Sequence, residues 1–335
     1  MKSARTRLGV IGVGAVAQVA HLPALAARDD VHIVGICDSD QAKARALAKR
    51  FAVRDIFEDI EDLLRIARPD AVVIATPNHF HEIHSLTALA SGAAVLCERP
   101  LALTSAGAQR VLAAQRRAGR PVLVGMNHRY RGDVQAVRAF VHGKELGALR
   151  AMRGGWYQFR PSRTELGWRL HPPEAGGGAL FDLGLPLVDL GLWLAEDVKP
   201  LQATASLHRA GSGVEDAGCA LVLCEGGYSI FVDVAWRYVG DHERVWLDVL
   251  GEAGSARIPP LGVYKEMHGT PMNVTPPTGT GRENLVPASY RAEWATFLAA
   301  VRDEVPPPPL DDQVLLHRTM EAVYRSAQEG RTVAV

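Results

Sequence analysis

The 335-residue sequence contains four cysteines, which are too few and too scattered for a fold held together by disulfides. None of them belongs to a C-x-x-C pair, so their spacing gives no zinc-binding signature either. We expect all four to be reduced thiols in the hydrophobic core.

Charge of one sign and long hydrophobic runs are also missing. The 37 lysines and arginines balance the 37 aspartates and glutamates, which makes a nucleic-acid or membrane-surface partner unexpected. Polar residues interrupt every apolar stretch before the roughly 18 residues that a membrane helix needs, and the start of the chain lacks a signal-peptide pattern. We therefore expect a cytoplasmic protein with no membrane or nucleic-acid partner.

Two regions with different patterns follow one another along the chain. Residues 8–125 alternate short, wholly apolar runs with helical patterns, which is typical of a parallel sheet covered by helices on both faces. Residues 149–257 carry longer alternating segments, which predict a largely antiparallel sheet with one buried face. The predicted fold class is α/β: a doubly wound Rossmann domain over 1–125, and an α+β domain with a large open sheet over 126–335.

A glycine-rich turn follows the first apolar run and has the form G-x-G-x-x-A. Its members are Gly12, Gly14, Ala15, Val16 and Ala17. Glycines permit the tight turn and a close approach of the backbone to a pyrophosphate, which the following helix N-terminus attracts. The alternative is a glycine-rich turn that binds nothing.

Asp38 ends the second apolar run, where a carboxylate binds the ribose diol of an adenosine. Asp38 would repel a 2′-phosphate, and Ser39 beside it offers no positive charge. The sequence therefore predicts NAD as the cofactor, with NADP less favoured.

Together with four later segments, this turn resembles the glucose-fructose oxidoreductase, inositol dehydrogenase and MocA (Gfo/Idh/MocA) family. The four segments are T-P-N-x-x-H from Thr76, G-x-x-x-R at 125–129, G-G-G-x-x-x-D-x-G at 176–184 and SAQEGR at 326–331. The resemblance covers almost the whole chain. It implies hydride exchange between a nicotinamide and a sugar, sugar acid or cyclic polyol, and a homodimer or homotetramer formed through the C-terminal sheet.

The resemblance also implies which residues bind the cofactor and a small, possibly anionic, substrate. Beyond the glycine turn, Asp38 and Ser39, the cofactor residues are Thr76, Pro77, Asn78, His81, Glu98, Arg99 and Asn127. The substrate residues are Arg129, Trp168, Arg169 and Asp182.

Two positions depart from the family pattern. The family ends its fifth strand in E-K-P and continues D-x-G-x-H, whereas this chain has Arg99 in place of the lysine and Pro186 in place of the histidine. A guanidinium stays protonated at neutral pH, and proline has no titratable atom, so neither can take a proton from an alcohol. Only six lysines occur against 31 arginines, and none of the six lies in a motif that could replace the missing one.

Two other residues are candidates for the acid/base role. Asp182 could act as a base in an enclosed site, or could instead cap the helix expected over 182–195. His171 lies just before the glycine run, and its alternative is a loop histidine in water. We interpret His21 as structural, and we expect no metal at His79, His81 and His84 because no carboxylate ligand accompanies them.

Three functions stay open at this point. The first is an NAD-dependent oxidoreductase in which Arg99 orients a substrate oxygen, with Asp182 or His171 moving the proton. The second is an NAD-binding sensor or regulatory protein without turnover. The third is a reductase that needs no protein acid, because hydride transfer is the chemistry of the cofactor.

Overall fold

The computed structural model describes residues 5–159, 166–209, 211, 213–277 and 284–335. The chain divides into two compact units, which are described separately below. The first unit comprises residues 1–130 and 284–314, and the second comprises residues 131–283 and 315–335. The segment 284–314, which the sequence placed in the C-terminal domain, thus belongs to the N-terminal unit.

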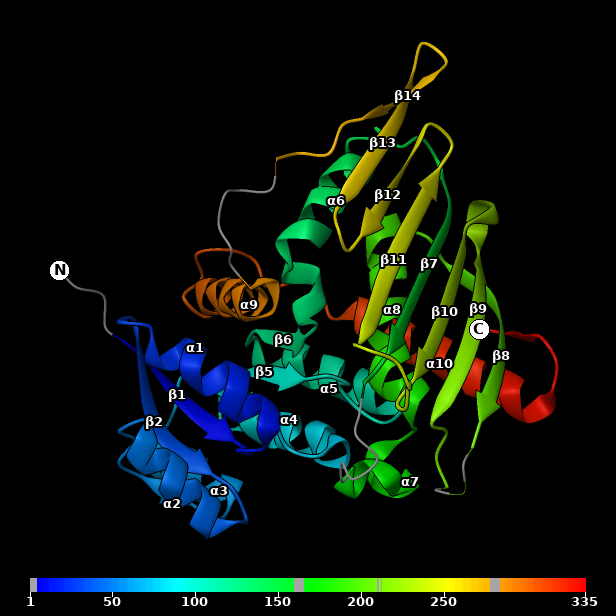
Figure 1. Cartoon of the computed structure of the whole chain (residues 1–335). Coiled ribbons are helices and arrows are strands. Elements are labelled where there is room, and N and C mark those ends of the chain that lie inside the picture. Colours follow the sequence, from blue (N-terminus) through cyan, green and yellow to red (C-terminus); the bar gives the residue numbers. More distant parts are fainter. Residues whose placement is uncertain (1–4, 160–165, 210, 212, 278–283) are drawn as a thin grey trace. The chain divides into compact units, whose positions relative to one another are not determined.

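The first unit contains a six-stranded sheet in the order β3-β2-β1-β4-β5-β6 (Figure 1). All of its neighbouring strands pair in parallel. The strands are β1 (Thr6–Ile11), β2 (Val31–Cys37), β3 (Ile56–Phe57), β4 (Ala71–Ile74), β5 (Ala94–Glu98) and β6 (Val122–Gly125). Every residue of β4 and β5 is buried, which explains why their sequences are apolar without alternation.

The helices of this unit are η1 (Ala17–His21, π), α1 (Leu22–Ala26), α2 (Gln41–Arg50), α3 (Ile60–Asp62), η2 (Leu63–Ala67, π), η3 (Asn78–Phe80), α4 (His81–Ala90), α5 (Ser105–Ala118), η4 (Asn127–Tyr130) and α9 (Leu285–Val301). Several of them, including α2, α3, α5 and α9, begin at a capping side chain. Thr104 caps α5 by accepting a hydrogen bond from the Gly107 N–H, and Gly119 ends α5 at φ +60°.

Helix α9 explains why residues 284–314 belong to the first unit. Its side chains Trp294, Phe297 and Leu298 are buried in the same hydrophobic cluster as Leu8 of β1 and Leu96 of β5. An apolar helix face identifies a core helix but not the core to which it returns, so the sequence pattern could not make this assignment.

The second unit is built on a nine-stranded sheet in the order β14-β13-β12-β11-β7-β10-β9-β8-β15. The strands are β7 (Leu149–Tyr157), β8 (Pro200–His208), β9 (Ala217–Cys224), β10 (Ser229–Ala235), β11 (Arg244–Gly251), β12 (Gly254–Ile258), β13 (Gly262–Met267), β14 (Thr270–Asn273) and β15 (Val333–Ala334). All pairings are antiparallel except that of β10 with β7. This confirms the predicted parallel and mostly antiparallel sheets.

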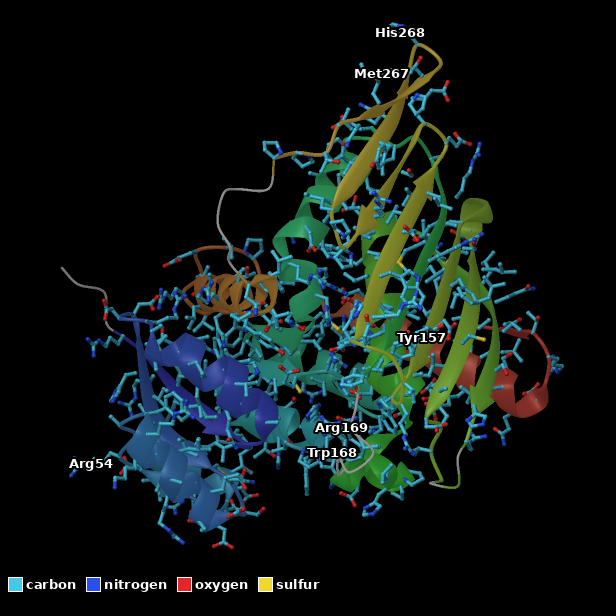
Figure 2. All side chains as sticks on the ribbon, viewed as in Figure 1. Arg54, Tyr157, Trp168, Arg169, Met267 and His268 are labelled. Carbon is cyan, nitrogen blue, oxygen red and sulfur yellow. The ribbon has the colours of Figure 1, made fainter. Side chains whose placement is uncertain are left out.

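Helices cover one face of the nine-stranded sheet (Figure 1). The helices of this unit are α6 (Gly132–His142), η5 (Gly167–Leu170), α7 (Pro172–Ala175), η6 (Leu180–Gly184, π), α8 (Leu185–Ala195), η7 (Glu225–Gly227) and α10 (Asp311–Glu329), which begins in the first unit. The other face exposes alternate side chains such as Leu223 and Phe231. Met267 and His268 lie at the tip of the β13–β14 hairpin (Figure 2).

One stretch, Pro172–Ala195, is long and apolar enough to cross a membrane. In the structure 78% of its most apolar window is buried inside the protein. It therefore belongs to the core of the second unit.

Candidate functional site

The glycine turn of the first unit has the geometry that a dinucleotide needs. Gly12 has φ +84°, and a Cβ there would lie 2.7 Å from the backbone of Ala75, so no larger residue fits. A Cβ on Gly14 would meet nothing closer than 3.9 Å, which leaves its backbone open to an approaching group. Ala15 is exposed at the start of the helix and Ala17 is buried beneath it. This open turn at a helix N-terminus fits a bound pyrophosphate.

Asp38 fixes this turn at the end of β2. Its Oδ2 accepts a hydrogen bond from the Val13 N–H at 2.8 Å, and its Oδ1 accepts one from the Asp40 N–H at 2.8 Å. Lys43 Nζ lies 3.5 Å from the same Oδ1, a positive charge that sequence reasoning missed. Lys43 is the third residue of α2, only five positions after Asp38, so a check of the charged residues in the first turn of the helix that follows the strand would have found it. Ser39 is exposed beside Asp38.

His81 is buried and connects the loops that follow β4 and β5. It is 1% exposed, with Nε2 2.8 Å from the Thr76 carbonyl oxygen and Nδ1 2.6 Å from that of Pro100. Burial lowers the pKa of His81, more than these two carbonyl oxygens raise it. His81 thus holds in place the loop that carries Thr76, Pro77 and Asn78, all half-buried.

Histidine 84 faces the same loop, with Nδ1 3.3 Å from Thr76 Oγ1. Burial lowers the pKa of His84 to about 4. Across the parts of the chain that the structure describes, no group of three histidine, cysteine, aspartate or glutamate residues is placed to hold a metal ion.

A hydrogen-bonded chain lies behind the end of β5. Trp294 Nε1 donates to His21 Nδ1 at 3.2 Å, and His21 Nε2 lies 2.9 Å from Glu98 Oε1. Because an indole N–H can only donate, Nδ1 accepts and the ring proton sits on Nε2, which donates to Glu98. Glu98 Oε2 in turn accepts the N–H of Arg99 at 3.3 Å. Burial raises the pKa of Glu98, but the His21 bond and the Arg99 charge outweigh it and lower that pKa.

Arg99 follows the carboxyl end of β5 and is half-buried. Its backbone N–H is held by the hydrogen bond to Glu98. Asn127 is 5% exposed, and its Nδ2 donates to Ser289 Oγ of α9 at 3.1 Å. Arg129, expected at a substrate, forms an ion pair with Asp312 at 2.7 Å and its side chain is 13% exposed.

The second unit holds Asp182 on a π-helical turn, a form that often marks functional positions. The side chain is half-buried, and its Oδ2 accepts a hydrogen bond from Trp236 Nε1 at 2.9 Å. Trp236 is 1% exposed. Trp236 directly follows β10 and lies 54 positions from Asp182, so no local sequence pattern could have identified this bond.

Glu215 supports the same turn from inside the second unit. It is 1% exposed, and its Oε1 accepts hydrogen bonds from the backbone N–H groups of Gly178 and Leu180 and from Tyr324 Oη. A Cβ on Gly178 would collide with the Glu215 backbone, which explains a glycine there. The turn before Asp182 is therefore rigidly held.

Three further predicted residues lie on this unit's surface. His171 has a 64% exposed side chain, with Nδ1 2.9 Å from Glu174 Oε1, which matches the alternative of a solvated histidine. Trp168 and Arg169 are adjacent on η5, half-exposed, with the guanidinium 4.5 Å from an indole ring centroid (Figure 2). Pro186 is buried in the first turn of α8, a position that tolerates proline because its N–H is not required.

Known proteins give the class to which this arrangement belongs. Residues 6–126 match the model "Oxidoreductase family, NAD-binding Rossmann fold", and residues 134–257 match the "GFO/IDH/MocA C-terminal domain". A putative UDP-kanosamine synthase oxidoreductase subunit of Amycolatopsis mediterranei is 30% identical over 75% of this chain and 74% of its own length. The chain therefore belongs to the GFO/IDH/MocA oxidoreductase family, as the five motifs predicted.

Two similar proteins span nearly the full length. D-glucoside 3-dehydrogenase of Escherichia coli K12 is 25% identical over 99% of both chains. The crystal structure of GenD2 from gentamicin A biosynthesis, in complex with NAD, is 26% identical with a TM-score of 0.86, covering 100% of this chain and 97% of that one. The relation thus extends over both units.

Proposed function

We propose that this protein is an NAD-dependent oxidoreductase that transfers a hydride between the nicotinamide and a ring hydroxyl of a sugar, sugar acid or cyclic polyol. The observation that carries the proposal is the open Gly12–Ala17 turn closed on one side by the Asp38 carboxylate. The E. coli relative, a D-glucoside 3-dehydrogenase, and the NAD complex of GenD2 support the same chemistry. Cytoplasmic residence belongs to this proposal.

The cofactor, when bound, supplies the hydride acceptor or donor, and the chain's own residues position the substrate. Arg99 holds a substrate oxygen, and a carboxylate or phosphate would suit it because a guanidinium binds both in bidentate fashion. Trp168, Arg169 and Arg129 complete the proposed substrate contacts. Asp182 accepts a hydrogen bond from the reacting hydroxyl and is one candidate for its proton, whereas the exposure of His171 makes it the weaker candidate.

NAD is the proposed nucleotide because the Asp38 carboxylate would repel a 2′-phosphate. Lys43 beside Asp38 is a feature of this strand end that would favour NADP. Titrations with NADH and NADPH on the wild type and on Lys43→Ala test the assignment. Tighter binding of NADPH by the wild type, lost in the variant, would overturn it.

The decisive assay follows NADH absorbance with pools of sugars, sugar acids and inositols, in the wild type and in the Arg99→Lys, Pro186→His double variant. Wild-type turnover that the double variant loses supports an enzyme built around Arg99. Intact NADH binding without wild-type turnover, with activity appearing in the double variant, would instead establish the NAD-binding sensor. The observation that favours this second candidate is Pro186, which is buried in α8 and offers no titratable group.

We also propose that the uncovered face of the nine-stranded sheet joins copies of the chain into a homodimer or homotetramer. Leu221, Leu223 and Phe231 lie on this face on the paired strands β9 and β10, and Phe231 is 38% exposed. Light scattering should give two or four chain masses for the wild type and a smaller assembly for Phe231→Glu. A monomeric wild type would refute the proposal.

A further inference from the structure

Glu293 is a buried carboxyl at a position where the sequence pattern calls for an apolar side chain. On α9 the buried positions Ser289, Glu293, Phe297 and Ala300 follow one another every three to four residues, so Glu293 lies on the buried face. Its side chain is 0% exposed. Both of its oxygens lack a hydrogen-bond partner among the residues that the structure describes.

Such a group is costly unless something else requires it. A buried carboxyl without donors loses its hydration and gains no compensating bond, so glutamine or leucine would fit at least as well. Burial raises the pKa of Glu293 well above its usual value, the nearby Glu98 charge raises it further, and Arg99 lowers it. Glu293 therefore holds a proton at pH values at which an ordinary glutamate is ionised.

The neighbours of Glu293 on α9 contact the hydrogen-bonded residues at the end of β5. Tyr290, three residues before Glu293, packs edge-on against His21, with the two ring centroids 5.4 Å apart. Trp294, the residue after Glu293, donates a hydrogen bond to the same His21 ring. His21 donates to Glu98, which accepts the Arg99 N–H. The charges of Glu98 and Arg99 act on Glu293, and the Glu293 carboxyl in turn acts on the Tyr290 and Tyr130 hydroxyls; His21 is bonded to Glu98.

We propose that Glu293 and Glu98 form a proton-storing pair that exchanges the substrate proton, the task that Arg99 and Pro186 cannot perform. This inference rests on the proposed oxidoreductase function. Glu98 is the open end of the pair, with an 11% exposed side chain, and Glu293 is the closed end. Neighbouring carboxyls of this kind hold one proton between them, because a second negative charge nearby is unfavourable.

The reaction balances through this pair. In the oxidation the substrate carbon gives its hydrogen with two electrons to the nicotinamide, the O–H bond breaks and the C=O bond forms. The released proton goes to the ionised pair at Glu98 and ends on Glu293. In the reduction the protonated pair returns that proton to the new alkoxide oxygen. Glu293 acts through Glu98 and is therefore a positioning and proton-storing residue.

The test is the pH dependence of kcat for oxidation in the wild type, Glu293→Gln and Glu293→Asp. Wild-type kcat should rise with pH through one ionisation. Glu293→Gln should lower kcat about 100-fold or more, the usual contribution of a proton-transfer group, and lose that ionisation. Glu293→Asp, which keeps a carboxyl, should restore it. Glu145→Gln, the same substitution at an exposed carboxylate outside the proposed site, is the matched control and should keep both kcat and the ionisation; Asp182→Asn is measured beside it because Asp182 is the other candidate for the proton.

Other outcomes separate this inference from the proposed function. A Glu293→Gln variant with wild-type kcat and pH profile overturns the pair while the oxidoreductase stands, as does loss of the ionisation in Asp182→Asn alone. If the wild type binds NADH without turnover, the ratio of the Kd values for NAD⁺ and NADH is measured against pH. A Glu293-dependent slope in that ratio supports the pair, because the ionised form favours cationic NAD⁺. A slope unchanged in Glu293→Gln overturns it.

Discussion

Glu215 in the second unit and Glu293 in the first unit are the same residue type with almost the same burial, yet their surroundings are opposite. Glu215 accepts three hydrogen bonds and ties the glycine run to α10 through Tyr324. Glu293 accepts none from the described residues. The comparison teaches that burial alone does not give a carboxyl its role. Glu215, with its three bonds, is part of the framework, whereas the unbonded Glu293 is free to gain and lose a proton.

The largest expected effect is the loss of stability when Glu215, the carboxylate with three hydrogen bonds, is removed. Glu215→Ala leaves two backbone N–H groups and the Tyr324 hydroxyl buried without their acceptor, so it should destabilise the protein by about 3–5 kcal/mol. Urea unfolding at neutral pH measures this loss. Glu145→Ala, which removes an exposed partner of Lys265, is the control and should cost less than about 1 kcal/mol. Equal costs for the two variants would remove the distinction between framework and surface carboxylates.

Removing one donor from Glu215 should have a smaller effect. Tyr324→Phe deletes the hydroxyl that donates to Oε1 and leaves the two backbone donors in place. Since a hydrogen bond to a charged group contributes about 1.5–3 kcal/mol, the unfolding free energy should fall by that amount. Thermal and urea unfolding should agree on the loss. A neutral result would show that the two backbone bonds alone satisfy Glu215.

Asp182 is a third case, because a hydrogen bond from Trp236 orients its carboxylate and the residue also belongs to the proposed site. Trp236→Phe keeps an aromatic ring in the core and removes the N–H that donates to Oδ2. We expect a loss of about 1 kcal/mol in stability and of roughly tenfold in kcat, with KM changed less. Unfolding curves and steady-state kinetics check both. A tenfold change in KM alone would assign Asp182 to binding.

Much of the proposed cofactor site could be predicted from the sequence, because its residues are neighbours along the chain or follow successive strands. Gly12, Gly14 and Asp38 occur in a fixed order around one strand-turn-helix unit, and the structure brings Asp38 back onto the Val13 N–H. The parallel sheet itself follows from wholly apolar runs.

The rest depends on residues that are far apart in sequence. Trp294 meets His21 across 273 positions, and Tyr324 meets Glu215 across 109, distances at which a local pattern has no information. Glu293 breaks the apolar periodicity of its helix, which is the one local signal that could have identified it. Strands β12, β13 and β14 were only partly foreseen, because short hairpin strands with exposed faces carry a weak alternation.

The last prediction, for Glu293→Gln, is the smallest effect at moderate pH. It has the opposite sign, because this variant should be more stable than the wild type. For Glu293 the folded pKa is raised above the unfolded value of about 4.5, so its contribution to stability is fully present below that value. As the pH rises from there toward the folded pKa, the unfolded chain ionises first and stability is lost, by up to about 1.4 kcal/mol per pH unit. Glu293→Gln lacks this slope.

The variant should therefore be nearly as stable as the wild type near pH 4.5 and more stable than it at higher pH. Unfolding free energies of both proteins, measured across this range, give the difference directly. Glu215→Gln is the matched control: the same substitution at the bonded carboxylate weakens three hydrogen bonds and should destabilise the protein at neutral pH. If Glu293→Gln were also destabilising there, Glu293 would be a framework residue like Glu215, and the contrast between the two would disappear.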